Sequence, residues 1–194
     1  MGKLDKLYWK MMEWFQGDAK RIQHFIKVQN IAKQIGEQEN IDSSTLFVLE
    51  ASAMVHDIGI RAAEEKYGKC SGKLQEEEGP KVAKPLLEEL EFDASDIERI
   101  LYLIAHHHTY SEIDGIDYQI LVEADFLVNF LEEATPKDTI KKTCEKVFKT
   151  KTGIEMCKLM YEERQKQPIS ETWANDNIQE LDDFIESQGI YIRQ

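Results

Sequence analysis

Residues 51–60 read ASAMVHDIGI, and this stretch places His56 and Asp57 side by side at the end of an apolar run, just before Gly59. Two interpretations are open for the pair. They are surface polar residues at the point where a helix ends, or they are two ligands of one metal ion. The choice depends on where the rest of the chain directs its polar side chains.

The composition is that of a globular protein. The chain has 194 residues, 42% hydrophobic and 31% charged, which predicts one domain with a substantial core, or one domain with an extension. No apolar stretch approaches the twenty residues that a membrane-spanning helix needs, so no membrane partner is expected. The first sixteen residues carry charges throughout, which is not typical of a secretory signal. The sequence favours no particular oligomeric state.

Charge and cysteine content narrow the possible partners. A net charge of −13 argues against general nucleic-acid binding, because neutralising phosphates requires a basic face. A small anionic substrate is still compatible with this charge, provided that a bound cation or nearby lysines offset the negative potential of the protein. The three cysteines (Cys70, Cys144 and Cys157) are odd in number and widely spaced. They predict reduced thiols in a cytoplasmic protein, without a disulfide framework or a zinc knuckle.

Hydrophobic periodicity predicts an all-α protein, since apolar residues recur at spacings of three and four and no long run alternates at period two. We expect helices over about 4–15, 18–36, 42–56, 80–90, 95–104 and 120–131, with residues 70–79 irregular and Pro80 in a first helical turn. Gly17 is expected to end the first helix, and Asp18 and Asp42 to cap the next two. Beyond Pro136 we expect two or three more helices, one capped by Ser170. The predicted architecture is a compact helical bundle over 1–135, with its core at about 18–131, and a C-terminal helical extension over 136–194 packed on the same domain.

Several polar side chains fall on the buried faces of these expected helices. Four of them come from separate places in the chain: His24, His56, Asp57 and Asp125. A single inward histidine is most often a core residue bonded to a carbonyl group. Inward aspartates are costly to bury unpaired, and no inward lysine or arginine faces them, so this set predicts a bound cation. His107 and His108 continue the inward stripe after Ile104, whereas His106 falls off it.

The order of these residues resembles the HD-domain superfamily of metal-dependent phosphohydrolases. His24 is followed by the pair His56-Asp57 in the context HDIG, then by AHHHTY at 105–110 and by EADFLVN at 123–129, which contains Asp125. The resemblance covers roughly residues 18–131. It implies that His24, His56, Asp57 and Asp125 bind one divalent ion, with manganese, iron, cobalt, nickel and magnesium all compatible with two nitrogen and two oxygen ligands.

The resemblance also implies an activity, the hydrolysis of a phosphate ester of a small molecule, expected to be a nucleotide, by a water that the metal activates. Asp57 is then the candidate base, His107 or His108 a donor to the phosphate or the leaving group, and Glu78 a residue that orients water. Both phosphomonoesterase and phosphodiesterase chemistry fit the pattern. Members with two metals carry an additional histidine between the HD pair and the later cluster. This chain has none between His56 and His106, so one metal is expected.

Two alternatives accompany this hypothesis. A non-catalytic nucleotide-binding or sensor protein could retain an HD-type site, although its complete ligand set favours catalysis. A local basic stretch also stands out in an acidic chain: Lys137, Lys141, Lys142, Lys146, Lys149 and Lys151. Its interpretations are an exposed helix face and a surface that steers phosphate. Tyr110 and Tyr118 are candidates for contacting a substrate ring.

Overall fold

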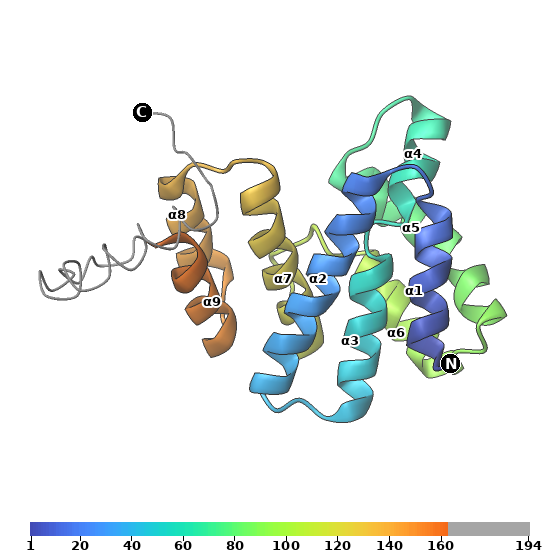
Figure 1. Ribbon diagram of the computed structural model, residues 1–194, viewed down its shortest axis with the longest axis horizontal. Coiled ribbons are helices and arrows are strands. Elements are labelled where there is room, and N and C mark those ends of the chain that lie inside the picture. Colours follow the sequence, from blue (N-terminus) through green and yellow to red (C-terminus); the bar gives the residue numbers. More distant parts are fainter. Residues whose placement is uncertain (163–194) are drawn as a thin grey trace, which may run out of the picture. The chain divides into compact units, whose positions relative to one another are not determined.

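The computed structural model describes residues 1–162, and within that range the chain forms nine helices and no strand (Figure 1). The helices are α1 (Lys3–Trp14), α2 (Ala19–Gln38), α3 (Ser43–Val55), α4 (Gly59–Tyr67), α5 (Gly72–Glu89), α6 (Ala94–Ile104), α7 (Ile116–Glu132), α8 (Lys137–Val147) and α9 (Lys151–Tyr161). The all-α prediction is confirmed.

The core forms around α2, which packs against α3 and α7, one on each side in Figure 1. Its buried positions include Phe25, Val28, Ala32 and Ile35, at the three- and four-residue spacings of one helical face. His24 lies at the start of this same buried face. The stripe that builds the core therefore also directs an imidazole inward, toward α3 and α7.

Local signals set several helix ends as expected. The Asp18 side chain accepts a hydrogen bond from the Arg21 N–H, and Asp42 accepts from Ser44 and Thr45, each at 3.0 Å. Gly17, with φ of +88°, follows α1 in the left-handed region that favours glycine. The prediction that α2 stops at Gly36 was wrong, because the helix continues to Gln38.

The segment from 59 to 89 differs most from expectation. Residues 70–79 are not irregular: Ser71 caps α5, which runs from Gly72 and contains Pro80 in its interior. A proline is more common in a first turn because it lacks an N–H, and that preference misplaced the start of this helix. The short helix α4 was not expected at all. It packs closely against α5, so tertiary contacts outweigh local preference here.

The cysteine prediction was wrong for two of the three residues. Cys144 on α8 and Cys157 on α9 form a disulfide, while Cys70 is free. The two cysteines are 13 residues apart, and the helical hairpin of α8 and α9 brings them together. Spacing in the sequence could not show that hairpin. The cytoplasmic location inferred from reduced thiols therefore loses part of its support.

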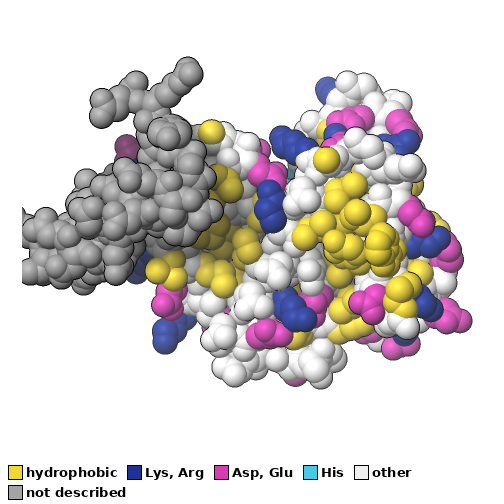
Figure 2. Space-filling view, viewed as in Figure 1, with side chains coloured by type: hydrophobic (Ala, Val, Ile, Leu, Met, Phe, Trp, Pro, Cys, Tyr) yellow, Lys and Arg dark blue, Asp and Glu magenta, His cyan; other side chains and the backbone are white. Residues whose placement is uncertain are grey.

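Residues 1–161 form one compact unit, which includes α8 and α9. No helix within the described range is long and apolar enough to cross a membrane. Apolar side chains gather on the part of the viewed surface formed by α1, where Trp9 is 57% exposed (Figure 2). The expected helix capped by Ser170 lies outside the described residues.

Candidate metal centre

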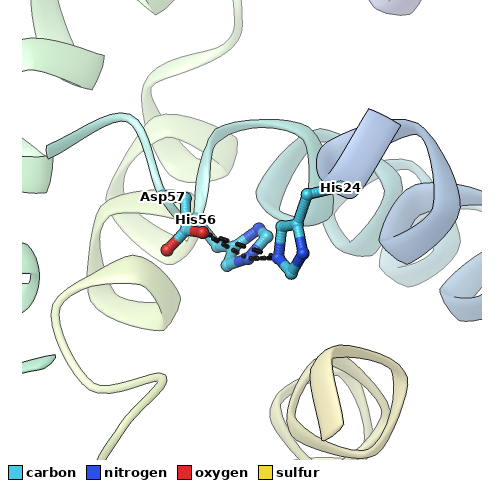
Figure 3. Close-up of side chains that lie close together, drawn as sticks. All are labelled: His24, His56 and Asp57. Carbon is cyan, nitrogen blue, oxygen red and sulfur yellow. Dashed lines mark hydrogen bonds and ion pairs between the residues drawn. The ribbon is translucent and has the colours of Figure 1, made fainter. Parts of the chain in front are cut away.

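Three helices bring the four predicted ligands together. His24 comes from α2 and Asp125 from α7, and both side chains are buried. His56 caps the C-terminus of α3, and Asp57 follows it in the turn before α4. Because the helix ends at Val55, the adjacent side chains of His56 and Asp57 can turn toward the same point (Figure 3).

The ligand atoms lie within a few ångströms of one another. His24 Nε2 is 3.2 Å from His56 Nε2, 3.2 Å from Asp125 Oδ1 and 3.5 Å from Asp57 Oδ2. His56 Nε2 is 3.5 Å from each of the two carboxylates. Metal–ligand bonds of about 2.1 Å place neighbouring donor atoms about 3.0 Å apart in an octahedron and about 3.4 Å apart in a tetrahedron. The spacing of the two histidine nitrogens from each other and from each carboxylate therefore suits one divalent ion.

Hydrogen bonds on the far side of each imidazole support the same fit. His24 Nδ1 lies 3.0 Å from Glu132 Oε2, and His56 Nδ1 lies 2.9 Å from the Ala53 carbonyl oxygen. These acceptors assign the ring protons to both Nδ1 atoms, so that both Nε2 lone pairs face the centre. Two lone pairs 3.2 Å apart repel each other unless a proton or a metal ion lies between them. A divalent cation satisfies both rings and both carboxylates at once.

Without a metal ion, the histidines and aspartates of this cluster shift one another's pKa values. Burial alone would lower the pKa of His56, but Asp57 and Asp125 outweigh it and raise that pKa to about 9. Burial would raise the pKa of Asp57, but His56 and His107 outweigh it and lower that pKa to about 2. The pKa of Asp125 falls well below its usual range for the same kind of reason, against its own burial. Protons on the histidines thus take the place of the metal charge.

These shifts predict how the stability of the chelated protein depends on pH. The raised pKa of His56 contributes stability that is fully present below its ordinary value of 6.5 and is lost as pH rises through 9. The lowered pKa of Asp57 contributes stability that is lost only as pH falls through 2. We therefore expect the melting temperature in excess chelator to fall between about pH 6 and pH 9.5.

Calorimetric scans at the two pH values would measure this fall. Metal-loaded protein is the control, because a metal that replaces the protons removes the dependence on His56 and adds its own binding energy. If the melting temperature of the metal-free protein changed with pH no more than that of the metal-loaded protein, the assignment of His56 and Asp57 to a metal site would be contradicted.

Two of the three later histidines reach this group. His107 is buried, its Nδ1 faces the Ile104 carbonyl oxygen at 2.7 Å, and its Nε2 is 3.7 Å from Asp57 Oδ1 without a hydrogen-bond partner. His108 Nε2 faces Gln75 Oε1 at 2.7 Å, and a ring nitrogen of His108 lies within 4.8 Å of a ligand atom of Asp57. His106 Nδ1 instead faces the Tyr102 carbonyl oxygen, as its position off the inward stripe predicts.

The structure does not bring Glu78 to the centre. Its buried carboxylate accepts hydrogen bonds from Lys66 at 2.9 Å, Lys81 at 3.0 Å and the Tyr67 hydroxyl at 3.0 Å. The lysines, Lys66 above all, lower its pKa to about 2. Three donors on α4 and α5 hold its Oε1, and no hydrogen bond or salt bridge joins Glu78 to any of the four predicted ligands.

Sequence reasoning missed three residues that support the ligands. Glu132 holds His24, and Asn129 donates to Asp125 Oδ1 at 2.9 Å. Both lie on α7, four and seven residues after Asp125, a helical spacing that could have pointed to them. Gln75, the partner of His108, gave no such signal, because residues 70–79 were expected to be irregular.

A second set of potential ligands shares Asp57 with the first. The ligand atoms of Asp57, His107 and His108 lie within 4.8 Å of one another, as do those of His24, His56 and Asp57. This second set has three members, whereas two ions in one site need more ligands and a bridging carboxylate. The expectation of one metal per chain stays a prediction.

A cavity of about 330 Å³ opens beside the four ligands and is wide enough for a small phosphorylated molecule. Three of the predicted ligands line it (His24, Asp57 and Asp125), together with Gln75 and His108. Lys20 and Arg21 also line it and bring positive charge to an otherwise acidic rim.

Comparisons with solved structures agree with this architecture. A predicted HD superfamily hydrolase from an uncultured Thermotogales bacterium is 22% identical, with a TM-score of 0.60 over 93% of this chain and 92% of the other. Bacillus subtilis YpgQ, crystallised in complex with ADP, is 17% identical, with a TM-score of 0.57 over 94% of this chain and 95% of the other. At these identities the likeness shows the fold. No curated protein gave a significant match.

The sequence profile of the HD domain matches residues 21–146, which is more than half of the 194 residues and includes every ligand of the candidate centre. The likeness in fold agrees with that match, as does the convergence of His24, His56 and Asp57, with Asp125 beside both histidines. This chain therefore belongs to the HD domain family, whose members include metal-dependent phosphohydrolases.

Proposed function

We propose that this protein hydrolyses a phosphate ester of a small molecule, with a nucleotide as the expected substrate. The observation that carries the proposal is that His24 Nε2 and His56 Nε2 lie 3.2–3.5 Å from each other and from both Asp57 and Asp125, beside an open cavity. A divalent ion held there supplies Lewis-acid chemistry, a charge at a phosphoryl oxygen and a lowered pKa for an attacking water.

The residues of the chain would divide the remaining work. Asp57 contacts the centre through Oδ2 and turns Oδ1 toward His107, so it is placed to take a proton from water at the rim of the cavity. Burial, and then His107, lower the pKa of His108 to about 4, so His108 is neutral at pH 7. We propose that neutral His108 donates its one ring N–H to a phosphate oxygen in exchange for its contact with Gln75 Oε1, and does not transfer a proton.

A nucleotide substrate has support from two sources. The cavity combines the ligand carboxylates with Lys20 and Arg21, the mixture of charges that a metal-bound phosphate requires. The relative YpgQ was crystallised in complex with ADP, which shows that a protein of this fold can bind a nucleotide.

A substrate panel tests the proposal. The protein, stripped by a chelator and reloaded with manganese, cobalt, nickel, iron or magnesium in turn, would be assayed with nucleoside mono-, di- and triphosphates and with mono- and bis-p-nitrophenyl phosphate. We expect release of phosphate or nitrophenol with at least one metal and none in the chelated protein. Tight nucleotide binding without turnover under any loading would instead favour the non-catalytic sensor.

A further inference from the structure

A second and larger cavity, of about 620 Å³, lies between the segment 110–113, α7 and α8. Tyr110 and Phe126 form an aromatic part of its wall, and another part carries Lys142 and Lys146 from α8 and Lys149 from the segment after it. Hydroxyl groups of a serine and two threonines complete the polar lining, which contains no carboxylate. The cavity therefore combines positive charge, hydroxyl donors and aromatic rings.

The charge of this wall is concentrated and unpaired. Lys142, Lys146 and Lys149 are four and three residues apart, so they follow one side of α8 and its end. Among the described residues, none of the three forms a salt bridge with a carboxylate, whereas many other lysines there do. Lys149 Nζ donates to the Lys146 carbonyl oxygen at 3.1 Å, so all three ammonium charges lack a carboxylate partner within the described part of the chain, which is unusual at a net charge of −13.

The aromatic side is preformed. The rings of Tyr110 and Phe126 lie with their centroids 5.0 Å apart, and Tyr110 is 42% exposed. The Tyr110 hydroxyl lies 3.4 Å from His108 Nδ1, so this side chain separates the cavity from the one beside the metal ligands. A flat ring can pack against an exposed aromatic edge at little cost in side-chain entropy.

The position of the lysine-bearing helix is fixed by few but strong contacts. Ile140 is the buried residue of α8, Phe148 follows the helix into the core, and the disulfide joins Cys144 to Cys157 on α9. These contacts hold the lysine-bearing side of α8 opposite Tyr110 and Phe126. The lysines therefore extend from a backbone that is held in place, although their side chains are exposed, and this lowers the entropy lost when they bind an anion.

We propose that this cavity is a second ligand site, which binds an organic phosphate with an aromatic ring, such as a nucleoside polyphosphate, without a metal ion. The phosphate groups contact Lys142 and Lys146, and the ring packs against Tyr110. The site does not depend on the proposed hydrolysis, because none of the four predicted metal ligands lines it. The proposal gives the lysines of the basic stretch a role in binding, whereas the interpretation as an exposed helix face gives them none.

Calorimetry on the full chain in excess chelator tests the site with ATP, tripolyphosphate and adenosine as probes. We expect ATP to bind more tightly than either of the other two, because only ATP engages both walls. The double variant Lys142→Glu/Lys146→Glu should weaken ATP binding at least about tenfold, through loss of charge-assisted hydrogen bonds. Tyr110→Ala should reduce the affinity for ATP to that for tripolyphosphate.

The matched control is Lys141→Glu/Lys158→Glu, which makes the same change in net charge at two exposed lysines outside the cavity. We expect it to change ATP affinity by no more than about twofold. Failure of ATP to bind the metal-free protein would overturn the proposal. Equal losses in the two double variants would also overturn it, because they would show a general effect of charge.

Discussion

Asp57→Asn is expected to abolish turnover and to lower the affinity for the metal by at least about a hundredfold. Loss of a residue that only supports a ligand typically costs ten- to a hundredfold, and Asp57 is itself a ligand in this assignment. The amide keeps the size of the side chain but removes the charge, so two histidines and Asp125 alone would have to offset a divalent ion. Metal content after dialysis, followed by the phosphate-release assay, measures both effects.

Glu78→Gln makes the same chemical change at another buried carboxylate and serves as the comparison. Its partners are Lys66, Tyr67 and Lys81, so we expect the variant to retain metal even if it loses some stability. Full occupancy and activity in Asp57→Asn would contradict the assignment of the centre. Loss of metal in Glu78→Gln alone would restore Glu78 as a candidate.

Helical spacing was enough to predict which side chains converge. His24 precedes the buried Val28 by four residues and Asp125 precedes Val128 by three, so a period of 3.6 placed both inward before any contact was known. The free-energy cost of burying an unpaired carboxylate then indicated that a cation binds beside Asp57 and Asp125. The distances of 3.2–3.5 Å between ligand atoms agree with that reasoning.

Sequence patterns failed where the structure depends on contacts between segments. Glu78 was placed in an irregular loop, and the helix that actually contains it turns its carboxylate toward Lys66 and Lys81. Cys144 and Cys157 gave no sign of pairing, because their proximity depends on the hairpin of α8 and α9. Local periodicity describes the face of one helix and does not describe which helix lies opposite.

Gly59 shows why the region between 59 and 89 was hard to predict from local patterns. Its replacement by alanine is also the substitution with the largest expected effect on stability. A Cβ atom at Gly59 would lie 2.5 Å from the Gly79 nitrogen, 2.8 Å from the Gln75 carbonyl oxygen and 2.8 Å from the Gly79 Cα. All three are backbone atoms of α5, which cannot move aside as a flexible side chain can. The close approach of α4 and α5 therefore requires glycine at position 59.

Gly59→Ala is expected to destabilise the protein by about 3 kcal/mol or more, at the upper end of the cost of overpacking. For a domain of this size that corresponds to a fall in melting temperature of roughly 6–12 °C. Urea unfolding of the chelated proteins measures the loss directly, without a contribution from the metal. Since Gly59 lies two residues after Asp57, we also expect weaker metal binding in the folded fraction.

Gly79→Ala is the matched control at the same crossing. The nearest atoms to a Cβ there would be Ile104 Cδ1 at 3.8 Å, with Ile104 Cγ1 and the His56 carbonyl oxygen at 4.0 Å, which are ordinary contacts. The gain in helix propensity is offset by the crowding of any Cβ that precedes Pro80, so we expect a change within about 1 kcal/mol. Gly59 is the first residue of α4, where alanine carries little intrinsic cost, so a large loss confined to Gly59→Ala must come from the contact with α5. A loss for Gly59→Ala as small as that for Gly79→Ala would show that the crossing tolerates a Cβ and would contradict this account.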